Sequence, residues 1–213
     1  MIAVAAFALI VVYLVVAFGW RTWMQIKRTG DSGFRGISGR PRSAEWWGGV
    51  LFVVALAAGV TAPVAAWMGL PSVSGLDTRP IQILGFVVAL AGIIATLAAQ
   101  VSMGESWRIG VDAGEETELV TTGAFAVVRN PIFSAMSVAA VGFTLVVANA
   151  VALIGLAVLI VAIEIQVRVV EEPYLARVHG TDWDAYMARV GRFVPRLGTV
   201  RGTRSPDVAR DLH

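Results

Sequence analysis

The stretch IFSAMSVAAVGFTLVVANAVALIGLAVLIVAIEIQVRVVEE, residues 132–172, decides the fold of this chain. It holds two apolar arms, 132–148 and 151–167, separated only by Asn149 and Ala150. So short a gap predicts a tight antiparallel hairpin of two helices. Each arm is close to roughly 17 residues, the lower limit for a helix that crosses a membrane.

The second arm ends in four charged residues, Glu164, Arg168, Glu171 and Glu172. Their spacing of i, i+4, i+7 and i+8 places them on one side of a helix. Charged groups this close to a bilayer core are costly, so they need a physical reason to be there. We therefore expect this side of the helix to face a polar region in an otherwise apolar protein.

The composition extends the membrane interpretation to the whole chain. Of the 213 residues, 57% are hydrophobic and 15% are charged, whereas a soluble domain has about 25% charged residues. Three further apolar blocks lie at 2–18, 46–68 and 81–101. The sequence therefore predicts an all-α, polytopic membrane protein with about five transmembrane helices and a cytoplasmic C-terminal helical segment.

The distribution of basic residues predicts the orientation. Loop 19–45 and the tail after the fifth span are rich in arginine, whereas loop 69–80 contains only Arg79. Five spans place both arginine-rich segments in the cytoplasm and the N-terminus outside, while four or six spans would separate them. Lys27 is the single lysine in a chain rich in Ala, Val and Gly. This bias indicates a GC-rich bacterial genome, so we expect the bacterial inner membrane.

Three regions are expected along the chain. Residues 1–118 hold the first three spans with their loops, and the acidic segment 102–130 is expected to be a loop with short turns. Residues 119–196 form a core with the hairpin and a C-terminal helix, and the polar tail 197–213 is expected to be disordered. The C-terminal helix is predicted from an apolar stripe at helical spacing, formed by Tyr174, Val178, Trp183, Tyr186, Val190 and Phe193.

Several kinds of site are excluded. The chain has no cysteine, and its two histidines are His179 and His213, so we expect no metal site. It has no glycine-rich dinucleotide motif, phosphate-binding loop or hydrolase motif. A basic tail beside a membrane meets lipid headgroups more often than nucleic acid. We therefore expect the lipid bilayer as a partner and no nucleic acid.

Two groups of residues are candidates for chemistry. Arg129 precedes Asn130 and Pro131 at the expected start of the fourth span, where it either anchors at the membrane edge or contributes to a ligand site. Glu164 and Arg168 are spaced for a structural ion pair. The adjacent Glu171 and Glu172 repel each other unless a cationic group or a hydrogen-bond donor holds them.

Taken together, these residues resemble the isoprenylcysteine carboxyl methyltransferase family, which is related to the phospholipid methyltransferases. The resemblance rests on three motifs in the family order, with the hairpin between the first two. They stand here as GAFAVVRNPIF (123–133), RVVEEPYL (168–175) and VHGTDWDAYMARVGRFVP (178–195). It covers residues 119–196, the expected core, whereas the earlier spans match only in being hydrophobic.

The resemblance implies a membrane methyltransferase that uses S-adenosylmethionine in a cytoplasm-facing pocket and receives a lipophilic substrate from the bilayer. By position, Arg168 and Glu172 would be catalytic and orient the acceptor. The chain departs from the family pattern at Asn130, where the family has His, and at Phe133, where it has Tyr. The residues implied for the cofactor are Arg129, Asn130, Pro131, Phe133, Glu171 and Glu172.

Two other functions are weighed against the methyltransferase. A membrane reductase of the steroid-reductase type would have a similar size and would need NADPH and a proton donor such as Tyr174 or Tyr186. A transporter or scaffold without enzymatic activity is the third hypothesis. Transporters commonly have polar residues at mid-membrane and internal repeats, whereas the first three spans hold few polar residues, such as Thr61 and Thr96.

Overall fold

The computed structural model describes residues 1–33, 36–37, 39–104 and 118–200. Within them the chain is helical, and its β pairing is limited to two isolated bridges. The acidic residues expected in segment 102–130 lie outside this part of the chain, except Glu118. Residues 201–213, most of the expected polar tail, lie outside it as well.

The first helix is longer than its apolar block. Helix α1 (Ile2–Leu14) continues through a π-helical turn, η1 (Val15–Trp20), into α2 (Arg21–Thr29). The prediction of a loop that begins at residue 19 is therefore wrong for residues 19–29, which are helical. Gly19 does not interrupt the helix, which ends at Gly30 in the left-handed conformation at φ 78°.

The second and third spans end close to their apolar blocks. Helix α3 (Ala44–Trp67) begins at Ser43, whose Oγ accepts a hydrogen bond from the backbone N–H of Trp46 at 3.2 Å. Helix α4 (Arg79–Ser102) carries a proline in its first turn, where the missing N–H is harmless. Both helices are 24 residues long, which is enough to cross a bilayer.

The predicted hairpin is confirmed as α5 (Pro131–Val147) followed by α6 (Ala150–Ile165). Ala148 makes the turn in the left-handed conformation, and the Asn149 side chain accepts a hydrogen bond from the backbone N–H of Ala152 at 3.0 Å. The Asn149 amide also donates to the carbonyl of Ala62 in α3 at 2.9 Å. One fully buried asparagine therefore closes the hairpin and joins it to a neighbouring span.

Small residues allow α4 and α5 to pack closely. A Cβ atom added to Gly92 would lie 2.3 Å from the backbone nitrogen of Ala139. One added to Gly142 would lie 2.2 Å from the backbone nitrogen of Ala89. Backbones that approach this closely are typical of membrane helices, where packing rather than the hydrophobic effect drives association.

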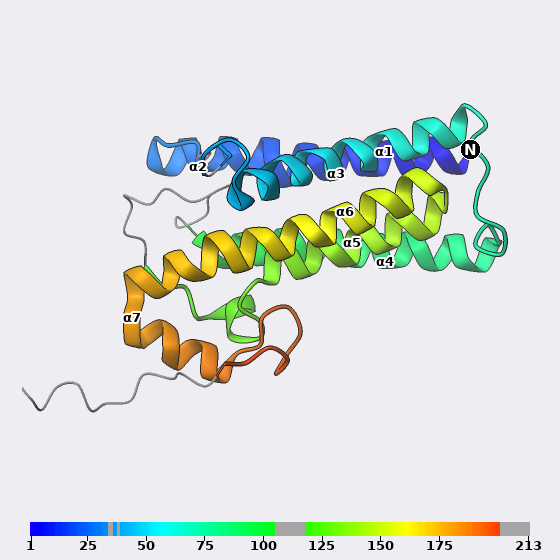
Figure 1. The fold of residues 1–213 in the computed structure, drawn as a ribbon. Helices are drawn as coiled ribbons and strands as arrows, with labels where there is room; N and C mark the ends of the chain where they lie inside the picture. Colours follow the sequence, from blue (N-terminus) through cyan, green and yellow to red (C-terminus); the bar gives the residue numbers. More distant parts are fainter. Residues whose placement is uncertain (34–35, 38, 105–117, 201–213) are drawn as a thin grey trace, which may run out of the picture.

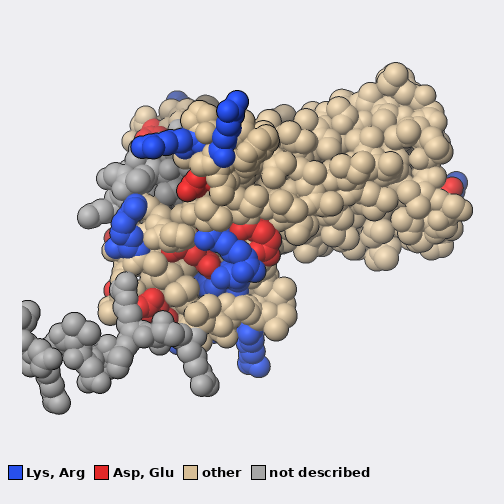
Figure 2. Space-filling model, viewed as in Figure 1, with Lys and Arg blue, Asp and Glu red and all other residues tan. Residues whose placement is uncertain are grey.

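The elements form one elongated bundle (Figure 1). Within the described ranges, four helices are long and apolar enough to cross a membrane, and α5 is a shorter apolar helix. The prediction of an all-α polytopic membrane protein is therefore confirmed. The N-terminus lies at the end of the bundle opposite α7, while the start of α5 lies at the same end as α7. Figure 2 shows charged side chains gathered mainly at the α7 end of the visible face.

The chain leaves the bundle through a change of helical winding. After α6 it forms the π-helical segment η4 (Gln166–Glu171) and continues as α7 (Glu172–Arg189). Pro173 lies in the first turn of α7, where a proline does not interrupt a helix. Helix α7 folds back at Gly180 (φ 50°, ψ −118°) and ends at Arg189. Val190 and Phe193, which belong to the predicted apolar stripe, therefore lie beyond the end of the observed helix.

Candidate active site

Arg129 and Glu172 meet at the charged end of the bundle. Nη2 of Arg129 donates to Oε1 of Glu172 at 2.9 Å. The Arg129 side chain is fully buried, and that of Glu172 is 13% exposed. The pair therefore joins the start of α5 to the start of α7 in a region largely shielded from solvent.

Arg192 forms a two-point contact with the same carboxylate. Its Nε donates to Oε1 of Glu172 at 2.8 Å, and its Nη2 donates to Oε2 at 2.7 Å. Such paired hydrogen bonds fix both the distance and the plane of the two groups. Glu172 thus bridges two guanidinium groups that would otherwise repel each other.

Backbone carbonyls surround the rest of the Arg129 guanidinium. Nη1 donates to the carbonyls of Val190 at 2.6 Å and Met187 at 3.3 Å, and Nη2 donates to Gly198 at 3.2 Å. The guanidinium carbon lies 5.8 Å from the centre of the Trp183 ring, within reach of a cation–π interaction. The arginine is therefore held by α7 and by the turn that follows α7.

The neighbouring guanidinium groups of Arg192 and Arg129 keep Glu172 ionised. Burial raises the pKa of Glu172, but hydrogen bonds and charges from Arg192 and Arg129 outweigh it, so the pKa lies below the ordinary 4.5. The hydrogen bond to Glu172 raises the pKa of Arg192 against the effect of burial, and the charges of Glu172 and Glu164 add to this increase. Near neutral pH the site therefore contains one carboxylate held between two cations.

The start of α5 is hydrogen-bonded to the segment after α7. The backbone N–H groups of Arg129 and Asn130 donate to the carbonyls of Gly191 at 2.8 Å and Arg192 at 3.1 Å. The side-chain amide of Asn130 also donates to Arg192 O, at 3.2 Å. Asn130 and Pro131 are both buried, and Pro131 is the first residue of α5. Asn130 therefore contributes to the contact between the two segments.

The remaining predicted site residues lie around this centre. Phe133 packs edge-on against Phe52 of α3, with ring centres 6.3 Å apart, so its ring is directed toward the apolar core. Glu171 is partly exposed, next to Glu172 at the end of η4. Arg168 is 56% exposed and forms the predicted ion pair with Glu164, which confirms that pair. Arg168 is thus directed to the outer part of the charged region.

Sequence reasoning did not assign a role to Arg192 or Trp183. Both lie in the third motif, so position in the motif was the available signal. Tyr186, which belongs to the predicted apolar stripe and is a proton-donor candidate in the reductase hypothesis, donates its hydroxyl to the carbonyl of Phe125 at 2.6 Å. Burial raises the pKa of Tyr186 to about 12. Its hydroxyl is therefore a structural link between α7 and η3 (Gly123–Ala126).

Two buried side-chain donors in this region differ from the rest of the hydrogen-bond network. Nε of Arg129 and Nε1 of Trp183 are buried, and neither has a hydrogen-bond partner within the described ranges. Buried donors are usually satisfied, so such atoms indicate a place where an acceptor group fits. Among the described residues, no three His, Asp or Glu side chains are grouped so as to hold a metal ion.

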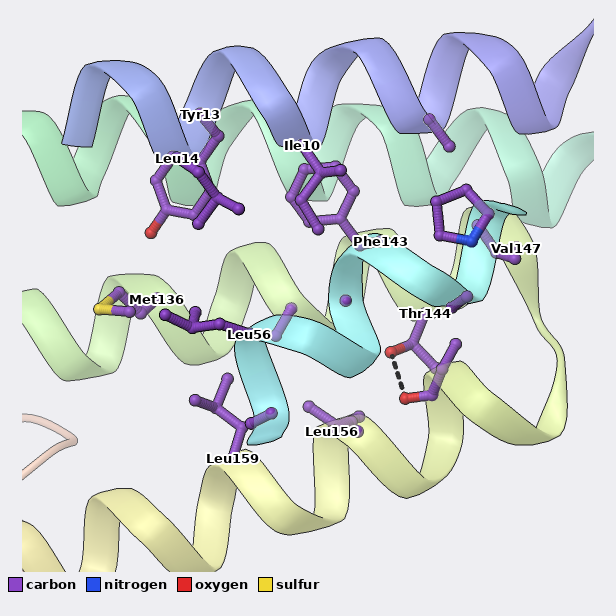
Figure 3. A pocket seen from close by; sticks show the side chains of 18 residues that line it. Ile10, Tyr13, Leu14, Leu56, Met136, Phe143, Thr144, Val147, Leu156 and Leu159 are labelled. Carbon is purple, nitrogen blue, oxygen red and sulfur yellow. Dashed lines mark hydrogen bonds between the residues drawn. The ribbon is translucent and has the colours of Figure 1, made fainter. Parts of the chain in front are cut away.

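An apolar cavity of about 70 Å³ lies deeper in the bundle, between α1, α3, α5 and α6. Figure 3 shows Ile10, Tyr13 and Leu14 extending toward it from α1, opposite Leu156 and Leu159 of α6. The polar groups near it are satisfied, since Tyr13 donates to Thr96 and Thr144 donates to the carbonyl of Ala152. The cavity therefore suits a hydrocarbon group.

Comparison with known proteins agrees with the motifs and the fold. A family model described as phospholipid methyltransferase matches residues 80–182. The match includes Arg129, Glu171 and Glu172, together with the whole hairpin, but ends before Arg192. A comparison with curated proteins found no match. Residues 80–182 are therefore similar to the phospholipid methyltransferase family, and this similarity supports a membrane methyltransferase.

Proposed function

We propose that this methyltransferase uses S-adenosylmethionine and acts on a lipophilic acceptor, by carboxylate O-methylation or a related methyl transfer. The observation that carries the proposal is the network formed by Arg129, Glu172 and Arg192. It lies at one end of a membrane helix bundle, and Arg129 and Glu172 come from two motifs of a methyltransferase family. Charged groups in this position near a bilayer indicate a functional site.

The donors and acceptors of the site suit the polar part of this cofactor. The unpartnered donors of Arg129 and Trp183 are suited to a carboxylate. Glu171, a partly exposed acid, is suited to an ammonium group. We infer that the cofactor site is formed by Arg129, Asn130, Pro131, Phe133, Glu171 and Glu172, with Trp183.

Glu172 has a different role from that of Glu171 in this proposal. Two guanidinium groups already compensate its charge. Glu172 therefore binds a third cation only weakly. We infer that Glu172 acts by fixing Arg129, while Arg168 at the outer part of the charged region orients the acceptor.

Bound S-adenosylmethionine supplies an activated methyl group on its sulfonium sulfur. What remains for the chain is to align the acceptor with that methyl group and to keep water away. The buried Arg129 and its ring of carbonyls provide a rigid wall for such a pocket. A rigid wall of this kind fixes the geometry before reaction.

The cavity supports an acceptor with an apolar chain. Phe133, Met136, Ala140 and Thr144 follow one another on one face of α5 at helical spacing, leading from the site toward the cavity. The Phe52–Phe133 contact lies along this face. We infer that the reactive head of the acceptor stays at the charged end while its hydrocarbon chain extends into the bundle.

We place the protein in a bacterial inner membrane, with the N-terminus outside and the charged end in the cytoplasm. The N-terminus lies at the end of the bundle opposite α7, as five spans require. Basic residues accumulate on the cytoplasmic side of membrane proteins. On the face shown in Figure 2 the charged side chains gather mainly at the α7 end.

Calorimetry on the purified protein in detergent tests the proposal. We expect S-adenosylmethionine to bind with an affinity in the micromolar range, and Glu172→Gln to abolish this binding. Glu164→Gln is the matched control, because Glu164 is 39% exposed and pairs only with Arg168 among the hydrogen bonds and ion pairs of the described residues. Binding of NADPH without binding of S-adenosylmethionine would instead support the reductase hypothesis.

A further inference from the structure

The segment Val190–Gly198, which follows α7, wraps around the start of α5. We call it the C-terminal clasp. Five of its carbonyls, those of Val190, Gly191, Arg192, Phe193 and Gly198, accept hydrogen bonds from three residues at the start of α5. The donors are the Arg129 side chain and backbone, the Asn130 side chain and backbone, and the Ser134 hydroxyl.

The clasp has a defined turn of its own. The backbone N–H of Arg192 donates to Leu197 O at 2.9 Å, and that of Leu197 donates to Val194 O at 3.1 Å. A Cβ atom on Gly191 would lie 2.1 Å from the carbonyl oxygen of Val194, so this turn requires glycine at 191. Leu197 and Gly198, the first residues of the expected polar tail, are part of this turn.

Arg192 connects the C-terminal clasp with Glu172 and, through Glu172, with Arg129. Its guanidinium grips Glu172 through two hydrogen bonds of 2.7 and 2.8 Å, and Glu172 in turn holds Arg129. The charge of Glu164 also acts on Arg192, and Glu164 is paired with Arg168. Arg129 and Glu172, which come from the first two motifs, are therefore linked to Arg192, a residue outside the family match.

We propose that Arg192 is a positioning residue of the methyltransferase, which fixes the Glu172 carboxylate so that Arg129 is presented to the cofactor. The inference rests on the proposed function and extends its site beyond residue 182. A carboxylate with a single guanidinium partner can rotate and adopt several contacts. With the two-point contact from Arg192 its plane is fixed, and the hydrogen bond to Arg129 is fixed with it.

Arg192→Gln, Arg192→Lys and Arg196→Gln test the inference. Gln removes the charge and the two-point contact, whereas Lys keeps a charge but gives a single point of contact. Arg196 is the matched control, because it is an exposed arginine of the same clasp. All variants are compared as full-length, monodisperse protein in detergent, by melting temperature and by calorimetric titration with S-adenosylmethionine.

We expect Arg192→Gln to weaken binding of S-adenosylmethionine by about tenfold or more, as for the loss of one or two charged hydrogen bonds. Arg192→Lys should restore part of the affinity, and Arg196→Gln should bind like the wild type. If Arg192→Gln fails to fold, the affinity of Arg192→Lys decides in its place. Because affinity is measured on folded protein, a residue that serves only stability would lower the melting temperature and leave the dissociation constant unchanged.

An unchanged affinity in both folded Arg192 variants would overturn the positioning role while leaving the proposed function standing. Wild-type protein that binds no S-adenosylmethionine would overturn the proposed function itself. The two failures are therefore distinguishable in a single set of titrations.

Discussion

Arg129 and Glu172 are 43 residues apart in the sequence, yet their side chains form an ion pair with a distance of 2.9 Å between Nη2 and Oε1. The hairpin α5–α6 explains this contact, because it carries the chain across the bundle and back to the same end. The first two motifs are therefore joined by a membrane hairpin and closed by an ion pair.

Glu172→Gln should destabilise the protein as well as remove cofactor binding. The substitution leaves two guanidinium groups close together, one of them fully buried, without the carboxylate between them. Breaking a buried ion pair costs about 3–5 kcal/mol, whereas an exposed pair such as Glu164–Arg168 contributes about 0–1 kcal/mol. Thermal unfolding in detergent should show a clear decrease for Glu172→Gln and little change for Glu164→Gln. Equal decreases in melting temperature for the two variants would contradict a larger contribution of the Glu172 ion pairs to stability.

The stability of the folded protein should depend on pH through the ionisation of Glu172. Its pKa in the folded protein lies below the ordinary 4.5, because Arg192 and Arg129 favour the carboxylate against the effect of burial. The stabilisation is therefore fully present above about pH 4.5 and is lost as the pH falls through the lower, folded pKa. The melting temperature of the wild type should decrease in this acidic range, and that of Glu172→Gln should decrease less. Parallel curves for the two proteins would show that Glu172 is not the group responsible.

Gly92→Ala should disrupt the packing of α4 on α5. Its Cβ would lie 2.3 Å from a backbone nitrogen that cannot move independently of α5. Overpacking of this kind costs about 1–3 kcal/mol, or more where the backbone must shift. Gly19→Ala is the control, because a Cβ at Gly19 has no atom within 4 Å. Melting temperatures in detergent should decrease only for Gly92→Ala, and an unchanged value would contradict the close approach of the two helices.

Gly59→Val should reduce methyl transfer to lipophilic acceptors without changing the binding of S-adenosylmethionine. Gly59 lines the cavity, and a Cβ there would lie 3.0 Å from the flexible end of Ile10, so the new side chain narrows the cavity. Incorporation of a labelled methyl group into a bacterial lipid extract should fall, while the dissociation constant measured by calorimetry stays the same. Unchanged incorporation would exclude the cavity as the site of the acceptor chain.

The helical architecture could be predicted from the sequence, because apolar blocks and the short gaps between them determine helices and turns locally. The two-residue gap at Asn149 and Ala150 predicted the α5–α6 hairpin. The length of the first helix was not predicted because the apolar residues end before the helix does. Gly30 was the residue that marks its end. The fold-back at Gly180 was also missed, since a stripe at helical spacing does not reveal a single non-helical residue.

The candidate site could be predicted in part. The i,i+4 spacing of Glu164 and Arg168 was enough for their ion pair, because both lie on one helix. The approach of Arg129 to Glu172 is a tertiary contact, which only the family resemblance indicated. The contacts of Arg192 were not predicted because they come from a turn after α7, where no periodic pattern exists.

Transfer of a labelled methyl group from S-adenosylmethionine to lipid is the decisive measurement. The purified wild-type protein, Glu172→Gln and Glu164→Gln are each incubated with the labelled compound and a bacterial total lipid extract, and the label in the organic phase is counted. We expect label in the organic phase with the wild type and only background with Glu172→Gln, while Glu164→Gln, which removes only the partner of Arg168, should keep label above background. Background label with folded wild-type protein, or equal label with Glu172→Gln, would contradict a methyltransferase site built on Arg129 and Glu172.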